Sequence, residues 1–108
     1  MVRCKDGVCL FGLQYEMRPV LIAADHIWAR HGQELVITST WEGDAHSARS
    51  YHYYGYAVDL RTRYFGADQE KVVADELRYK LPEVYDVVLH PNSHIHVEYD
   101  VERARRQE

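Results

Sequence analysis

The segment from Ser93 to Asp100, SHIHVEYD, alternates strictly between polar and apolar side chains. Because successive side chains of a β-strand point to opposite faces, this pattern predicts a strand with one buried face and one polar face. The polar face would carry His94, His96 and Glu98. The chain must therefore build a sheet that is covered on one side only.

A second predicted strand, from Gly55 to Arg61, carries Asp59 in an apolar run. A carboxylate in that setting must be hydrogen-bonded, paired or metal-bound, because an isolated buried charge is costly. His52 precedes Gly55, where the chain can bend enough to bring the imidazole over the strand.

Two histidines and one carboxylate form the ligand set of a catalytic zinc site. A single histidine is more often structural than metal-binding, so the prediction depends on convergence. We expect His52, Asp59 and one of the histidines of the pair His94 and His96 to meet at one zinc ion.

These segments also match a family pattern. Residues 50 to 59, SYHYYGYAVD, fit SxHxxGxAxD at every fixed position, and residues 94 to 96, HIH, fit the closing motif of the same group. Over about residues 18 to 100, the chain resembles the zinc D-alanyl-D-alanine carboxypeptidase and dipeptidase family. This family includes VanX- and VanY-type enzymes, phage endolysins that cut L-alanyl-D-glutamate bonds, and the Hedgehog signalling domain.

The resemblance implies a Hedgehog-like fold that binds Zn²⁺ through His52, Asp59 and His96, with Ser50 near the substrate. It also implies a metallopeptidase, a hydrolase that acts on the cell wall. The expected substrates are peptidoglycan stem peptides or D-Ala-containing peptides, cut as a D,D-carboxypeptidase or an L-Ala-D-Glu endopeptidase cuts them.

The chain departs from the family at the catalytic base. The family places an acidic residue three or six positions before the last ligand, and those positions are Ser93 and His90 here. An active enzyme would need His90 or His94 as the base, or Glu98 would have to reach in. The alternative is a catalytically impaired, zinc-stabilised module that binds the cell wall or a protein partner.

The polar segment from Thr40 to Arg49 predicts a loop that overhangs the metal site. Arg49 is a candidate to hold a substrate carboxylate by a bidentate contact. A solvated loop arginine is the commoner case.

The remaining segments complete a single α+β domain over residues 1–108, with two helices packed on a mainly antiparallel sheet. The apolar spacing predicts helices over 18–31 and 67–81 and strands over 34–39 and 84–89. Residues 2–11 predict a hairpin around Asp6-Gly7 that sets Cys4 opposite Cys9. The basic tail, 101–108, is expected to fray in solvent.

Composition narrows the range of possible binding partners. The formal net charge is -4, and no basic stripe exceeds the short run at 103–106, which argues against a nucleic-acid partner. No segment approaches a membrane span, and no signal peptide is visible. We expect a monomer made in the cytoplasm that reaches the cell wall as a phage or prophage product.

Overall fold

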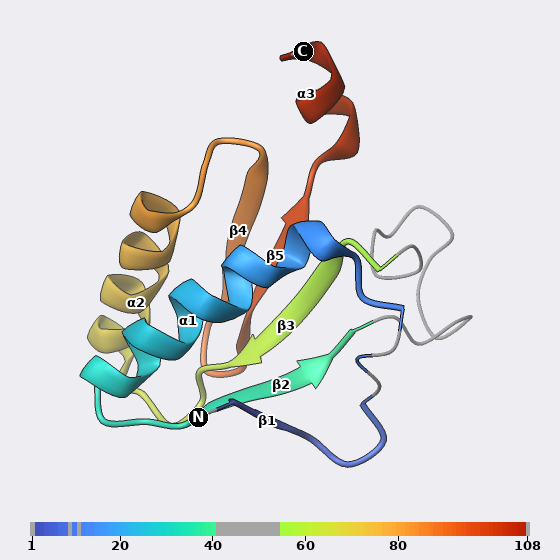
Figure 1. Ribbon diagram of the computed structural model, residues 1–108. Helices are drawn as coiled ribbons and strands as arrows, with labels where there is room; N and C mark the ends of the chain where they lie inside the picture. The colour runs from blue at the N-terminus through green and yellow to red at the C-terminus, as the bar shows by residue number, and fades with distance from the viewer. Residues whose placement is uncertain (1, 9, 11, 41–54, 108) are drawn as a thin grey trace.

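The structure is a computed structural model that describes residues 2–8, 10, 12–40 and 55–107. Within these residues, three α-helices and one 3₁₀ helix accompany a five-stranded sheet (Figure 1). The elements in chain order are β1 (Val2–Cys4), η1 (Tyr15–Met17), α1 (Arg18–Arg30), β2 (Leu35–Ser39), β3 (Ala57–Arg61), α2 (Ala67–Lys80), β4 (Tyr85–His90), β5 (His94–Tyr99) and α3 (Val101–Arg106).

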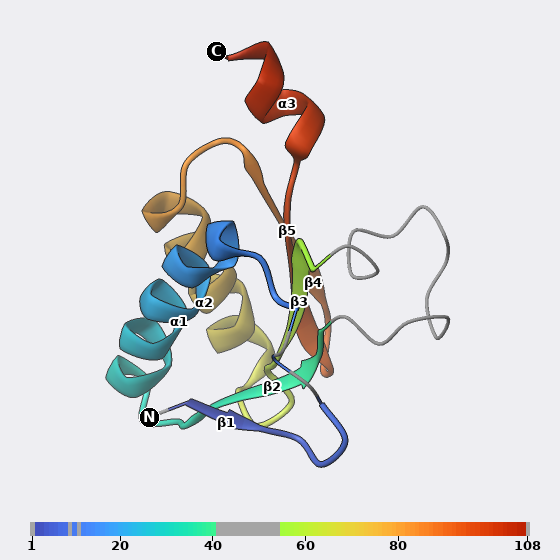
Figure 2. The ribbon, with the colours of Figure 1, turned by 45° about the vertical axis from the view of Figure 1, so that its right-hand side comes forward.

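Helices α1 and α2 both lie on one side of the sheet, as the side view shows (Figure 2). The core fills the space between them and the strands, and it includes Trp28, Met17, Ile27, Leu35, Ile37, Leu60, Leu77, Ile95, Val58 and Val97, each at most 1% exposed. The side of the sheet turned away from both helices is called the open face below. The predicted α+β class, with two helices on one face of a sheet, is confirmed.

The sheet is mixed and not purely antiparallel. Its strand order is β1-β2-β3-β5-β4, and β1 runs parallel to β2 while all other neighbours are antiparallel. The prediction of an antiparallel sheet is therefore wrong at one edge. The three strands that carry the candidate site, β3, β5 and β4, are antiparallel as expected.

The N-terminal segment explains this difference. The Asp6-Gly7 turn forms, since the Val8 amide donates to the Lys5 carbonyl at 3.0 Å and Gly7 has φ 86°. Strand β1, however, pairs with β2, and the Lys5 amide continues the contact by donating to Ile37 O at 2.9 Å. An isolated hairpin is marginal in water, whereas the edge of a buried strand offers a complete ladder. The predicted partner Cys9 lies outside the described residues.

The two long helices match their predicted ranges. Helix α1 ends before Gly32, which has φ 77° and can adopt this left-handed conformation at no steric cost. Its Trp28 indole donates to Arg61 O at 2.9 Å, which fixes the end of β3 beneath the helix. No helix among the described segments is long and apolar enough to cross a membrane.

The C-terminal tail is more ordered than predicted. Residues Val101–Arg106 form α3, and the Asp100 carboxylate caps it by accepting from the Arg103 amide at 3.0 Å. Arg103 also donates to Asp86 at 3.1 Å and to Glu83 O at 2.6 Å. The expectation of a frayed tail overlooked this N-cap signal, an Asp directly before the helix.

The strand alternation predicted for the site is confirmed. Leu60 on β3 and Ile95 and Val97 on β5 are fully buried against the helices. Asp59 and His96 alternate with them and keep 15% and 18% of their side chains exposed. They therefore lie on the open face.

Candidate metal centre

Asp59 and His96 form the centre of the candidate site. The register of β3 and β5 places them directly opposite each other, and His96 Nδ1 lies 2.8 Å from Asp59 Oδ1. Cross-strand partners on one face are separated by only about 5 Å at Cβ, so short side chains can meet. The pairing follows from the two strand patterns together with the register, which neither pattern specifies alone.

The other nitrogen of the His96 ring is also engaged. His96 Nε2 lies 2.5 Å from Glu98 Oε1, so the imidazole stands between two carboxylates. Burial of the ring opposes its protonation, but the hydrogen bonds and charges of Asp59 and Glu98 outweigh burial and raise the pKa of His96 to about 9. Without a metal, this ring is an imidazolium at neutral pH.

His94 approaches the same carboxylate from the next position along β5. Its Nε2 lies 3.6 Å from Asp59 Oδ2, and its Nδ1 lies 2.7 Å from Ser93 Oγ. The His90 ring stacks on the His94 ring, with centroids 4.6 Å apart and planes inclined by 21°. His94 and His90 are the two predicted base candidates. His94 contacts Asp59 directly, whereas His90 reaches the site only through its stacking on His94.

A buried carboxylate on α2, Glu70, holds the ends of the strands that carry the candidate site. Glu70 is 3% exposed; it accepts from the Thr62 hydroxyl at 2.6 Å and from the Asn92 amide at 2.9 and 3.0 Å. Thr62 follows β3, and Asn92 lies in the turn before β5. Glu70 thus joins the ends of the two strands that carry Asp59 and His96. Its helical spacing gave no signal of this role, because the partners come from loops.

The glycine of the predicted motif has a structural reason. Gly55 has φ 80°, and a Cβ at this position would lie 2.2 Å from Gly12 O. The Gln14 amide also donates to Gly55 O at 2.9 Å. Gly55 therefore lets the chain turn into β3 against the N-terminal segment, a close approach that any larger residue would block.

The predicted residues His52, Ser50 and Arg49 lie outside the described residues. Among the residues that are described, no group of three or more His, Cys, Asp or Glu side chains is arranged to hold a metal ion. Two of the three predicted ligands, Asp59 and His96, are adjacent. Glu98 does not complete the set because it lies on the far nitrogen of the His96 ring.

This pair fits zinc in its chemistry. One carboxylate oxygen and one imidazole nitrogen, both largely shielded from solvent, face each other across 2.8 Å. Imidazole and carboxylate are common zinc donors, and a metal ion would take the place of the proton that now lies between them. Glu98 on the remaining ring nitrogen is the usual arrangement behind a metal-bound histidine.

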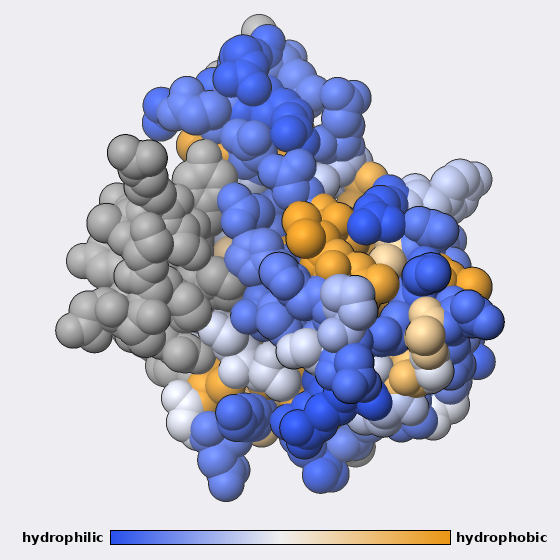
Figure 3. All heavy atoms as spheres, turned by 180° about the vertical axis from the view of Figure 1, so that it is seen from behind, coloured by the Kyte–Doolittle hydropathy of each residue, from blue (hydrophilic) through white to orange (hydrophobic). Residues whose placement is uncertain are grey.

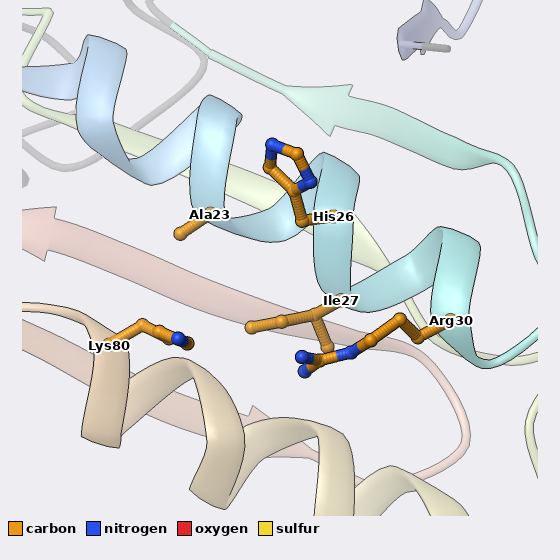
Figure 4. Close-up of a pocket in the computed structure, with 5 residues that line it drawn as sticks. All are labelled: Ala23, His26, Ile27, Arg30 and Lys80. Atoms are coloured by element: carbon orange, nitrogen blue, oxygen red, sulfur yellow. The ribbon is translucent and has the colours of Figure 1, made fainter.

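A separate hollow lies on the helical side of the molecule. It has a volume of about 260 Å³ between α1 and α2 and is lined by Ala23, His26, Ile27, Arg30 and Lys80. Arg30 and Lys80 extend toward each other across it (Figure 4). It contains none of the predicted site residues, so the candidate site remains on the open face, where the contacts of Asp59, His94, His96 and Glu98 converge.

The open face is mainly hydrophilic, with a hydrophobic patch near its middle (Figure 3). Val88, directly opposite His96 on β4, is 46% exposed.

Comparison with known proteins adds no assignment to this geometry, since no protein-family model and no curated protein matches the chain.

Proposed function

We propose that the protein is a zinc-dependent peptidase that acts on peptidoglycan stem peptides or other D-Ala-containing peptides. The observation that carries this proposal is the direct opposition of Asp59 and His96, with the carboxylate and the imidazole 2.8 Å apart on the open face. Together with the SxHxxGxAxD match, this pair supports zinc binding by Asp59, His96 and His52.

Zinc in such a site, when bound, polarises a scissile carbonyl and lowers the pKa of a bound water toward neutrality. The protein's own residues have three tasks. Asp59 and His96 would hold the ion, and Glu98 fixes the His96 ring through Nε2, which leaves Nδ1 directed at Asp59.

The third task is proton transfer, and His94 is the base that the geometry favours. Its Nε2 lies on the side of Asp59, and Ser93 Oγ orients the ring from Nδ1. Glu98 is less suited, because its carboxylate is held at the far side of the His96 ring. His90 stacks on the His94 ring and does not contact Asp59. A positioned base contributes typically 10²–10⁴-fold to rate.

The second candidate function is a zinc-stabilised module that binds the cell wall or a protein partner without cleaving it. One observation favours it: the positions three and six before His96 hold Ser93 and His90, so no carboxylate stands where the resembling enzymes place their base. Both candidates share the metal and differ only in turnover.

The deciding experiment is incubation of the zinc-loaded protein with purified peptidoglycan, followed by mass analysis of released fragments. The peptidase reading expects stem-peptide fragments, together with their loss in His94→Ala at unchanged zinc content. His26→Ala, on α1 and away from the open face, is the matched control. Zinc binding without any released fragment would overturn the peptidase in favour of the binding module.

A further inference from the structure

The open face of β3, β5 and β4 is organised in three cross-strand rows. The registers align one residue from each strand, so that each row runs across the sheet. The rows are Arg61-His94-His90, Asp59-His96-Val88 and Ala57-Glu98-Asp86. We call them the basic row, the metal row and the acidic row. The open face therefore changes from basic to acidic along the strands, with the candidate metal pair between the two ends.

The two ends differ in how their charges are satisfied. In the acidic row, Glu98 contacts His96 Nε2 at 2.5 Å, and Asp86 accepts from Arg103 at 3.1 Å. Both carboxylates of that row thus have side-chain partners within the protein.

Arg61 in the basic row has no such counterpart. Its side chain is partly buried and belongs to the open face, because Leu60 beside it is fully buried on the other. Within the described part of the chain, the Arg61 guanidinium makes no hydrogen bond or ion pair. Its charge does favour ionisation of the Tyr64 phenol, whose pKa is raised chiefly by burial. No buried side-chain nitrogen or oxygen of the described residues lacks a hydrogen-bond partner, so the five donors of the Arg61 guanidinium face solvent and are open to a ligand.

We propose that Arg61 binds a carboxylate of the ligand, on the residue that follows the peptide bond placed at the metal row. This inference rests on the proposed function and names the ligand chemistry of the same site. Arg61 is then a specificity-determining residue, and the basic row fixes the direction in which a peptide lies across the face.

The spacing agrees with this assignment. Adjacent rows are two residues apart along a strand, which is about 6.6 Å at roughly 3.3 Å per residue. One peptide residue advances a chain by about 3.8 Å, and a guanidinium–carboxylate hydrogen bond adds about 2.8 Å. A peptide that lies along β3 with a carbonyl at the metal row therefore directs a carboxylate on its next residue toward the basic row, where the flexible Arg61 side chain is available to meet it.

Both bond types of the proposed function supply this group. A peptide that ends in D-Ala-D-Ala carries a terminal carboxylate on the residue after the bond. A D-glutamate that continues the chain through its side chain keeps a free α-carboxylate in the same place. The required ligand is thus an amide whose following residue bears a free carboxylate.

The test compares two ligands on the zinc-loaded protein: D-Ala-D-Ala, and the same dipeptide with a C-terminal amide. Binding is measured by NMR titration, so that it does not depend on turnover. We expect the carboxylate form to bind at least about 10-fold more tightly, and we expect Arg61→Gln to reduce this ratio toward one. Arg61→Lys should keep part of the preference for the carboxylate form. Arg63→Gln, at an exposed position after β3, should keep the whole preference.

The outcomes separate this inference from the peptidase proposal. An Arg61-dependent preference without cleavage supports the inference and removes the peptidase. Equal binding of the two dipeptides by the parent protein, no binding of either, or a preference that survives in folded, zinc-bound Arg61→Gln overturns the inference. If Arg61→Gln does not fold, the Arg61→Lys variant decides, since an unchanged ratio there contradicts a bidentate guanidinium contact.

Discussion

The two faces of β3 place different demands on the sequence. On the covered face, Val58 and Leu60 are fully buried between the sheet and the helices, where apolar volume is the requirement. On the open face, Asp59 contacts His94 and His96, where charge and hydrogen-bond geometry decide. The covered face holds the fold together, whereas the open face carries the candidate site. Substitutions on alternate residues of one strand should therefore have separable effects.

The largest expected effect is on the metal. Asp59→Ala removes a proposed ligand and should abolish binding of about one zinc per chain, since three protein ligands define an open site. Equilibrium dialysis followed by elemental analysis measures it. His94→Ala, on the same face but outside the proposed ligand set, should keep most of the zinc. Full zinc occupancy in Asp59→Ala would exclude Asp59 as a ligand.

The second effect is on stability. Leu60→Ala leaves a cavity on the covered face and should lower the free energy of unfolding by about 2–5 kcal/mol. Val88→Ala on the open face, where the side chain is 46% exposed, should cost less than about 1 kcal/mol. Urea denaturation of both variants measures the difference. Similar losses would show that the two faces are not distinct in their contribution to stability.

The third effect is a pH dependence of the metal-free protein. His96 has a pKa of about 9 when folded and an ordinary pKa near 6.5 when unfolded, so its protonation stabilises the folded state. This contribution is fully present below pH 6.5 and is lost as the pH rises through 9. The loss is at most about 3 kcal/mol.

Urea denaturation of the chelator-treated protein at pH 6 and pH 9.5 tests this prediction, with His96→Gln as the control. The variant should lose less stability over the same interval. Zinc should reverse the trend, because the metal competes with the proton for Nδ1. Equal slopes in the parent and the variant would exclude an imidazolium between Asp59 and Glu98.

The smallest expected effect concerns the charge that lies on the covered side. Glu70→Ala leaves the Asn92 amide and the Thr62 hydroxyl without their partner and should cost about 1–3 kcal/mol. Asp68→Ala, at an exposed position in the first turn of α2, should cost less than about 0.5 kcal/mol. Thermal denaturation compares the two. If Glu70→Ala also weakens zinc binding, Glu70 supports the geometry of the site as well as the fold.

The sequence predicted most of the fold because its strands and helices have clear periodicity. The alternation of residues 93–100 placed Ile95 and His96 on opposite faces, and the helical spacing located α1 and α2 to within about one residue. The prediction from sequence failed where two strand pairings compete. Nothing local to Val2–Cys4 distinguishes a hairpin from a parallel partner in β2, because the choice depends on an edge that exists only after the sheet forms.

The candidate site was predictable in its residue types but not in its contacts. Alternation selected Asp59, His94 and His96 without specifying which histidine meets the carboxylate, and only the family resemblance named His96. The register of β3 and β5 pairs Asp59 with His96 and Arg61 with His94. The part played by Glu98 also depends on a side-chain direction along one strand, which a period of two does not specify.

The pairing of Asp59 with His96 also bears on the order of folding. The two residues are 37 positions apart, and the whole of α2 and β4 lies between them. Closing a long segment costs entropy before its contacts form, whereas α2 and the turn between β4 and β5 need only local contacts. We therefore expect β3 to join β5 after those elements have formed. Interactions that form late in folding slow unfolding more than they accelerate folding. Zinc bound at this pair should therefore lower the unfolding rate and leave the folding rate nearly unchanged.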